Sequence, residues 1–264
     1  MITVSSAHYL IFHPARTSVR VRAKAITGVG VVDYANNIFV DPPTACTGTT
    51  IGCNEDPYVF SDPWLYSFCH ATQLRRISKK NQNVGTGSIL IFAEDCKESE
   101  TIYVDTVVVV ENAFPWPTPG ATPPKGLTSR SSLPVQNHPH FRGGLKRTLG
   151  KGHNGQITYT ARSFSASAAS LGSYSFLPIT EAFERVPLCL ANMQTTLSQK
   201  IRARWKGRYP VLLDSNEACS LITEIDNCAA FKIISPIKKG KVGAKVSACQ
   251  RERLVVPAGE RCHE

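Results

Sequence analysis

The stretch that decides the fold consists of two apolar runs, Gly87-Ser88-Ile89-Leu90-Ile91-Phe92-Ala93 and Ile102-Tyr103-Val104-Asp105-Thr106-Val107-Val108-Val109-Val110. Both runs are short, rich in β-branched and aromatic residues, and flanked by polar residues, which is typical of buried strands rather than helices. The polar segment 94–101 between them predicts an antiparallel hairpin with a longish loop. We therefore expect this hairpin to form the centre of a small barrel-like sheet.

Further strands are predicted on both sides of the hairpin. The segment 18–25 alternates between small apolar residues and the cations Arg20, Arg22 and Lys24, which is the period of a half-exposed strand. Its basic face could contact phosphates, or it could be only the solvated side of an edge strand, where charges block unwanted pairing. The other predicted strands lie at 8–13, 28–33, 155–161 and 231–235. The segment 174–179 is a short segment that ends at a proline, and 209–213 is either a strand or the entry to a loop.

Two helices are predicted in the last third of the chain. The segment 192–206 has an apolar residue at every fourth position, which predicts a buried face. A row of cations on another face of this helix suits either phosphate or solvent. Ser215 is expected to cap a second helix at 217–227. The apolar row is Met193, Leu197 and Ile201, and the cationic row is Lys200, Arg204 and Arg208.

The composition places limits on the class of protein. The chain has 264 residues, of which 42% are apolar and 19% charged, values typical of a globular protein with a real core. No apolar run approaches the about 18 residues that a membrane span needs, and the first residues do not resemble a secretory signal. We therefore expect a cytoplasmic protein without a membrane partner. Its nine unevenly spaced cysteines favour free thiols over a disulfide framework.

The charge and the metal-binding residue types also bear on function. The formal net charge of +10 favours polyanionic partners, nucleic acid first, although a solvated basic surface has the same composition. Cys46, Cys53 and the Cys69-His70 pair do not match the compact spacings of zinc sites. We accordingly expect neither a metal nor another cofactor.

The domain organisation is expected to change near residue 180. Residues 1–180 are predicted to form the barrel core, with a proline-rich loop at 112–139, because repeated prolines fix an extended backbone without donors. Loops of that length often carry function. Residues 181–264 are predicted to form a helical and β extension packed on the core, or part of one continuous domain.

The proline-rich loop leads into the most chemically loaded stretch, Asn137-His138-Pro139-His140-Phe141-Arg142-Gly143-Gly144-Leu145-Lys146-Arg147. Recognition of a base needs an aromatic face, donors and acceptors for the base edge, and cations for the flanking phosphates. Trp64 is a candidate stacking group, but large aromatic residues bury readily, so it could equally belong to the core. The candidate binding residues are Trp64, His70, Gln73, Arg75, Arg76, Asn137, His138, His140, Arg142, Lys146 and Arg147.

Three motifs carry a family resemblance: Val84-Gly85-Thr86-Gly87-Ser88-Ile89-Leu90-Ile91-Phe92, His138-Pro139-His140, and Asn154-Gly155-Gln156-Ile157-Thr158-Tyr159-Thr160-Ala161. Their order, over roughly residues 55 to 180, resembles the third type of nucleotide-modification-associated domain, with its "V-G-x-G-D-x-x-L-F" strand, His-Pro-His element and "N-x-I-Y-x-A" strand. Ser88 replaces the expected acidic residue, and segment 94–97 replaces an aromatic-rich run. The hairpin also resembles the PUA-like (pseudouridine-synthase-associated) barrels.

The resemblance implies a domain linked to modified nucleotides, nucleic-acid modification or defence, and PUA-like barrels often bind nucleic acid. The expected fold is α+β, with a small mixed or antiparallel PUA-like β-barrel and peripheral helices. Our first hypothesis is a non-enzymatic nucleic-acid or modified-nucleotide binding domain that reads a base in a basic pocket. The second is an enzyme acting on nucleotides or nucleic acid, with His138 or His140 as general base. The third is a protein-interaction module with an incidental basic surface.

Overall fold

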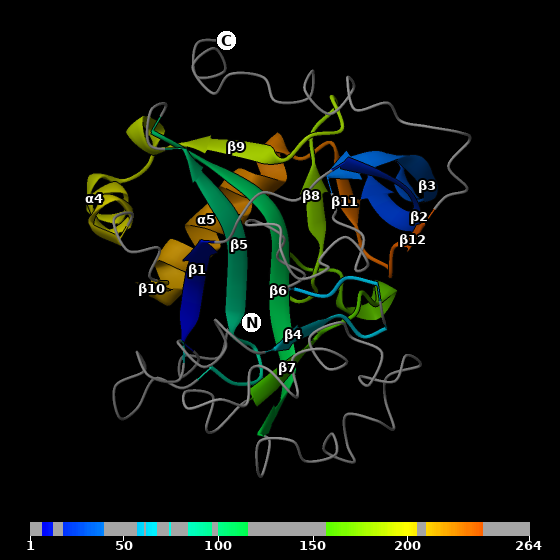
Figure 1. Ribbon diagram of the computed structural model, residues 1–264, viewed down its shortest axis with the longest axis horizontal. Coiled ribbons are helices and arrows are strands. Elements are labelled where there is room, and N and C mark those ends of the chain that lie inside the picture. Colours follow the sequence, from blue (N-terminus) through cyan, green and yellow to red (C-terminus); the bar gives the residue numbers. More distant parts are fainter. Residues whose placement is uncertain are drawn as a thin grey trace, which may run out of the picture.

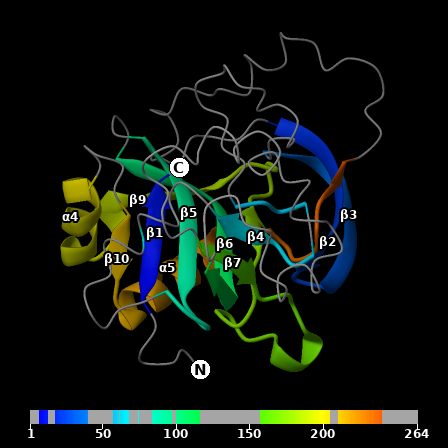
Figure 2. The same ribbon diagram turned by 60° about the horizontal axis from the view of Figure 1, so that its bottom comes forward.

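The computed structural model describes residues 7–12, 18–39, 57–60, 62–67, 74, 84–96, 100–115, 157–204 and 210–239. Within these ranges the fold is mixed α+β and consists mostly of strands, with two α-helices. The strands form two sheets, and Figures 1 and 2 show α4 and the pair β2–β3 on opposite sides of the molecule.

The first sheet is built around the predicted hairpin. In spatial order its strands are β10 (Val211–Leu213), β1 (His8–Phe12), β5 (Ile89–Cys96), β6 (Thr101–Pro115), β7 (Ile157–Ala161) and β4 (Leu65–Ser67). β5 and β6 pair antiparallel, as expected, whereas β1 runs parallel to β5. The loop between β5 and β6 is shorter than predicted, because the polar residues 94–96 continue the ladder beyond the apolar run.

β6 is the longest strand, and three chain segments share the edge that faces away from β5. β9 (Val186–Cys189) pairs with its first residues, Phe176 exchanges two backbone hydrogen bonds with Val107, and β7 pairs with its last residues. The predicted loop at 112–139 was wrong at its start. Asn112 and Ala113 still belong to β6, because they pair with Thr160 and Tyr159 of β7.

The second sheet has at its centre the alternating strand predicted at 18–25. Its strands are β3 (Gly30–Phe39), β2 (Ser18–Thr27), β11 (Phe231–Ile233), β8 (Leu177–Ile179) and the short β12 (Lys238–Lys239), which follows β11 along β2. β2 and β3 pair over all ten residues without a register shift. The strand order of the described residues leaves both sheets open, so closure into a PUA-like barrel is not confirmed.

The first sheet lies between two apolar clusters. On one face, Leu10, Ile89 and Val107 pack with the helices α4 (Thr195–Arg204) and α5 (Ser215–Cys228). On the other face, Leu90 and Phe92 pack with inward residues of the second sheet. Figure 1 shows α5 crossing the β5–β6 ribbon. This arrangement explains why both runs of the hairpin are continuously apolar, since each face of the ribbon is buried.

The two helices begin and end near their predicted positions. The predicted apolar row is confirmed for Leu197 and Ile201, which are buried. The cap of α5 is Asp214 rather than Ser215. The Asp214 carboxylate accepts from the Glu217 N–H, and Glu217 accepts from the Asp214 N–H. This reciprocal pair is a capping box, which satisfies two backbone donors at once.

The domain boundary expected near residue 180 falls inside shared sheets. β9 and β10 belong to the first sheet, and β11 and β12 belong to the second. Two short 3₁₀ turns interrupt this part of the chain: Ala166–Ala168 lies between β7 and β8, and Leu190–Asn192 lies between β9 and α4. Strands from both sides of the expected boundary therefore complete the same two sheets.

Candidate functional site

Of the eleven predicted binding residues, Trp64 is the one that lies within the described ranges. The His-Pro-His element and the expected pocket around it lie outside the described residues. The other ten predicted residues, which share this position outside the described ranges, are His70, Gln73, Arg75, Arg76, Asn137, His138, His140, Arg142, Lys146 and Arg147.

Trp64 precedes β4 and belongs to the core cluster between the two sheets. Its side chain is 5% exposed, and its backbone carbonyl accepts a hydrogen bond from the Ala161 N–H at 2.9 Å. So little exposed surface does not present a free ring face to a base. The burial therefore favours the core role of Trp64 over the role of a stacking platform.

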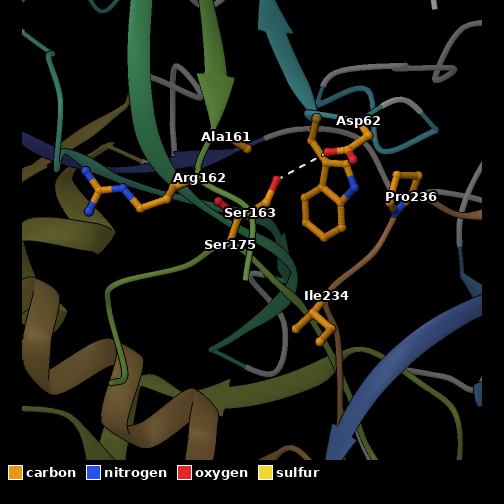
Figure 3. Close-up of a pocket in the computed structure, with 8 residues that line it drawn as sticks. Asp62, Ala161, Arg162, Ser163, Ser175, Ile234 and Pro236 are labelled. Atoms are coloured by element: carbon orange, nitrogen blue, oxygen red, sulfur yellow. Dashed lines mark hydrogen bonds between the residues drawn. The ribbon is translucent and has the colours of Figure 1, made fainter. Parts of the chain in front are cut away.

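Trp64 also forms part of the wall of a small recess where the two sheets meet (Figure 3). The recess is shallow, with a volume of about 10 Å³, which is roughly the space that one water molecule needs. Its lining residues come from four chain segments: Asp62 and Trp64; Ala161, Arg162 and Ser163; Ser175; and Ile234 and Pro236. Figure 3 shows Ser163 directed at Asp62, and the Ser163 hydroxyl donates to Asp62 Oδ1 at 3.2 Å, whereas Arg162 points away.

Backbone hydrogen bonds hold the walls of this recess together. The Ser175 N–H donates to the Arg162 carbonyl, and the Ile234 N–H donates to the Lys24 carbonyl, both at 2.9 Å. The Ser175 hydroxyl accepts from the Val109 N–H at 2.9 Å and is buried. The recess is therefore a fixed product of strand pairing, and Asp62 and Ser163 are its exposed polar groups.

A second candidate surface lies on the outer face of the second sheet. We define the cationic face as Arg22, Lys24 and Lys238, whose side chains are all exposed. Val21 and Ala25 are buried against the core, so the alternating residues of β2 must point outward, as the sequence predicted. In the register, Lys238 lies directly opposite Arg22. On the other edge of β2, Asp33 of β3 lies directly opposite Lys24.

Lys238 was not part of any predicted strand, so sequence reasoning missed its position. The contact between β12 and β2 joins residues more than 200 positions apart, and periodicity in one segment cannot report such a pairing. The available signal was the run Lys238-Lys239-Gly240-Lys241, which has the same charge as the outer side of β2.

One buried titratable group was also missed. His8 is fully buried at the start of β1, and its Nδ1 accepts the backbone N–H of Ile89 at 3.0 Å. Burial lowers the pKa of His8 below its ordinary value, and the nearby Asp214 carboxylate partly offsets this effect. A neutral His8 therefore helps to fix β1 against β5, which is a structural role rather than a catalytic one.

The described part of the chain lacks two kinds of feature. There, no group of three or more His, Cys, Asp and Glu side chains is arranged to hold a metal ion. Nor does any helix of the ranges given above combine the length and apolar character needed to cross a membrane.

We compared the chain with known proteins at three levels. Neither the protein-family models, nor the curated proteins, nor the solved structures yield a match.

Proposed function

We propose that this chain is a nucleic-acid-binding domain that contacts the phosphate backbone through the cationic face. Following the family resemblance, we also propose that it binds modified nucleotides or nucleic acid as part of a system of nucleic-acid modification or defence. The observation that carries the proposal is the exposed Arg22–Lys238 pair, with Lys24 two residues further along the same side of β2.

The register of β12 on β2 places two like charges opposite each other. Directly opposed residues of an antiparallel pair have Cβ atoms about 4.5–5.5 Å apart, and like charges at that spacing destabilise a sheet. Arg22 and Lys238 occupy such a pair. A phosphate lying over the pair would turn this repulsion into attraction, and release of counterions from the nucleic acid would add to the affinity. The net charge of +10 favours approach of the same class of partner.

The PUA-like barrel remains part of this proposal. Two connections between the sheets support it: the paired backbone hydrogen bonds of Val107 with Phe176, and the bond from the Ile237 N–H to the Val59 carbonyl at 3.0 Å. Val59 follows Tyr58, which forms an antiparallel bridge with Leu65, the first residue of β4. Contacts between the two sheets are one requirement of a closed barrel, and these two contacts support the proposal to that extent.

The test is the salt dependence of nucleic-acid binding, measured by fluorescence anisotropy with a labelled duplex and a labelled single strand. The wild-type affinity should fall steeply with salt. Arg22→Ala and Lys238→Ala should each lower the slope of log affinity against log salt by roughly 0.7–0.9, the value for one lost phosphate contact. The double variant should lose roughly twice that slope.

The matched control is Arg204→Ala, which removes one exposed cation from the end of α4. It should leave the slope within error of the wild type. Equal effects of Arg22→Ala and Arg204→Ala would mean that only total charge matters, and the cationic face would lose its assignment. A wild-type protein that binds neither strand form would refute the function itself.

A further inference from the structure

β3 is an edge strand of the second sheet, and Figure 2 shows it on the side of the molecule away from α4. Within the described ranges its strand partner is β2 alone, and the two pair over all ten residues without a bulge. The segment 30–39 contains no proline, lysine or arginine, residues that often protect an edge. The contacts proposed for barrel closure start from Phe176 and Ile237, next to β8 and β12, and leave this edge unused. A regular strand of this kind is a template for a further strand.

The backbone groups of Lys24 show which residues of β3 face this open edge. The Lys24 N–H donates to Ser235 Oγ at 2.7 Å, and the Lys24 carbonyl accepts from the Ile234 N–H at 2.9 Å, so both groups point away from β3. Asp33 lies opposite Lys24, which makes the two a pair without mutual hydrogen bonds. The N–H and carbonyl of Asp33 therefore point to the open edge. Alternation along the strand gives the same direction to the backbone groups of Val31, Ala35 and Asn37.

The side chains along this edge are exposed and carry little charge. Asp33, Ala35 and Asn37 are all exposed on the outer face of the sheet, and Asp33 carries the one charge among the residues of β3. The Asn37 N–H donates to Asn36 Oδ1 at 2.9 Å. This contact is local, so the carbonyl of an incoming strand can take the place of the Asn36 side chain. The edge therefore offers backbone donors and acceptors to a partner without a bulky or cationic barrier.

We infer that this edge pairs antiparallel with the same edge of a second copy of the chain, around a twofold axis at Ala35. In that register Asp33 lies opposite Asn37 of the second copy, whose amide can donate to the carboxylate. A register with the two Asp33 residues opposed would place like charges together. A shift by one residue would aim edge groups at groups that already bond to β2. The twofold pairing uses both open edges, so assembly stops at a dimer.

Sedimentation velocity over a wide range of protein concentrations tests the dimer, without nucleic acid and with a reductant that keeps Cys219 and Cys228 from linking chains. Asn37→Lys places a cation opposite Asp33 in both symmetry-related pairs and should lower the dissociation constant. Asn37→Asp places like charges there and should raise it. Each change should be roughly 2- to 30-fold, the effect of two cross-strand pairs. General repulsion between chains of net charge +10 predicts the opposite order.

Asn227→Lys and Asn227→Asp are the matched controls, because they add the same charges at an exposed position of α5. They should change the dissociation constant only slightly and in the order that net charge predicts. Ala35→Pro removes the edge N–H at the twofold axis and should abolish the dimer. A proline is tolerated where the strand N–H faces solvent, so the pairing with β2 should survive. Thermal unfolding of each variant in dilute solution shows that the fold is intact.

Amide hydrogen exchange locates the contact. The amides of Val31, Asp33 and Ala35 should exchange rapidly in dilute solution and slowly at high protein concentration. Slow exchange at every concentration would mean that the edge is covered within one chain, and would overturn the inference. A chain that stays monomeric at every concentration, or a tighter dimer for Asn37→Asp than for Asn37→Lys, would overturn it too. The inference does not rest on the proposed function, because none of these measurements involves nucleic acid.

Discussion

Lys200 and Arg202 of α4 and the Arg22–Lys238 pair of the cationic face have opposite electrostatic surroundings. On α4, Lys200 lies 2.7 Å from a Glu217 carboxylate oxygen, and Arg202 lies 2.7 Å from one of Glu100. On β2, the residue directly opposite Arg22 is another cation, Lys238. The first set of cations joins elements of the fold, whereas the second set costs stability. Position in the fold, rather than the number of cations, is therefore the reason that we propose this surface for a polyanion.

The largest change in stability is expected at His8, because its protonation would place a positive charge in the core. The core is a third environment, beside α4 and the cationic face. Burial lowers the pKa of His8 below its ordinary 6.5, with Asp214 partly opposing the shift. The folded state therefore resists protonation. The His8 contribution is fully present above pH 6.5 and is lost as pH falls through that value toward the lower pKa of the folded state.

Urea unfolding between pH 8 and pH 5 measures this loss. His8→Asn keeps an acceptor for the Ile89 N–H but does not titrate, so the stability of the variant should change less on acidification. A variant that loses stability with acid as steeply as the wild type would show that other groups cause the effect.

A smaller loss of stability is expected when Lys200 of α4 loses its carboxylate partner, Glu217. Glu217→Ala removes half of the capping box and the contact with Lys200, and should lower the free energy of unfolding by about 1–2 kcal/mol. Lys200 is substantially exposed, so most of the loss comes from the cap. Glu217→Gln, which retains acceptor atoms for the cap, is the control and should lose less. A neutral Glu217→Ala would contradict the structural role of these contacts.

The smallest change in stability, and the sharpest test of the comparison, comes from Lys238→Glu. It replaces a like-charge pair with an opposite-charge pair facing Arg22. Stability should rise by roughly 0.2–1 kcal/mol, the usual worth of a cross-strand pair, while nucleic-acid affinity falls. Chemical unfolding and anisotropy titrations on the same sample measure both. A variant that is both less stable and still fully able to bind would break the contrast between the two regions.

The fold was easier to predict than the site, for a physical reason visible in particular residues. Strand and helix periods are local, so β2 and α4 could be recognised from Val21 and Ala25 or from Leu197 and Ile201 alone. Pairing across the chain is not local. The opposition of Arg22 and Lys238, and the meeting of Asp62 with Ser163, appear only once distant segments are folded together.

Trp64 shows a second limit of sequence reasoning. Aromatic residues that stack on ligands and those that fill cores look alike in a sequence, and the choice depends on what covers the ring. The 5% exposure of Trp64 decides for the core. Asp214 and Ser215 show a third limit, since both can cap a helix, and the choice follows from the partner, Glu217, that lies three residues after Asp214.

The shared edge of β6 has a consequence for how the protein is made. The partner of its first residues, β9, follows about 80 residues later in the chain. At ~5–20 residues per second, a ribosome needs roughly 4–16 seconds to supply that partner. Throughout this interval the valine-rich ribbon has left the ribosome, or is leaving it, while one edge of β6 lacks backbone hydrogen-bond partners. Until residues 157–189 have been made, this edge of β6 is therefore open to pairing with other chains.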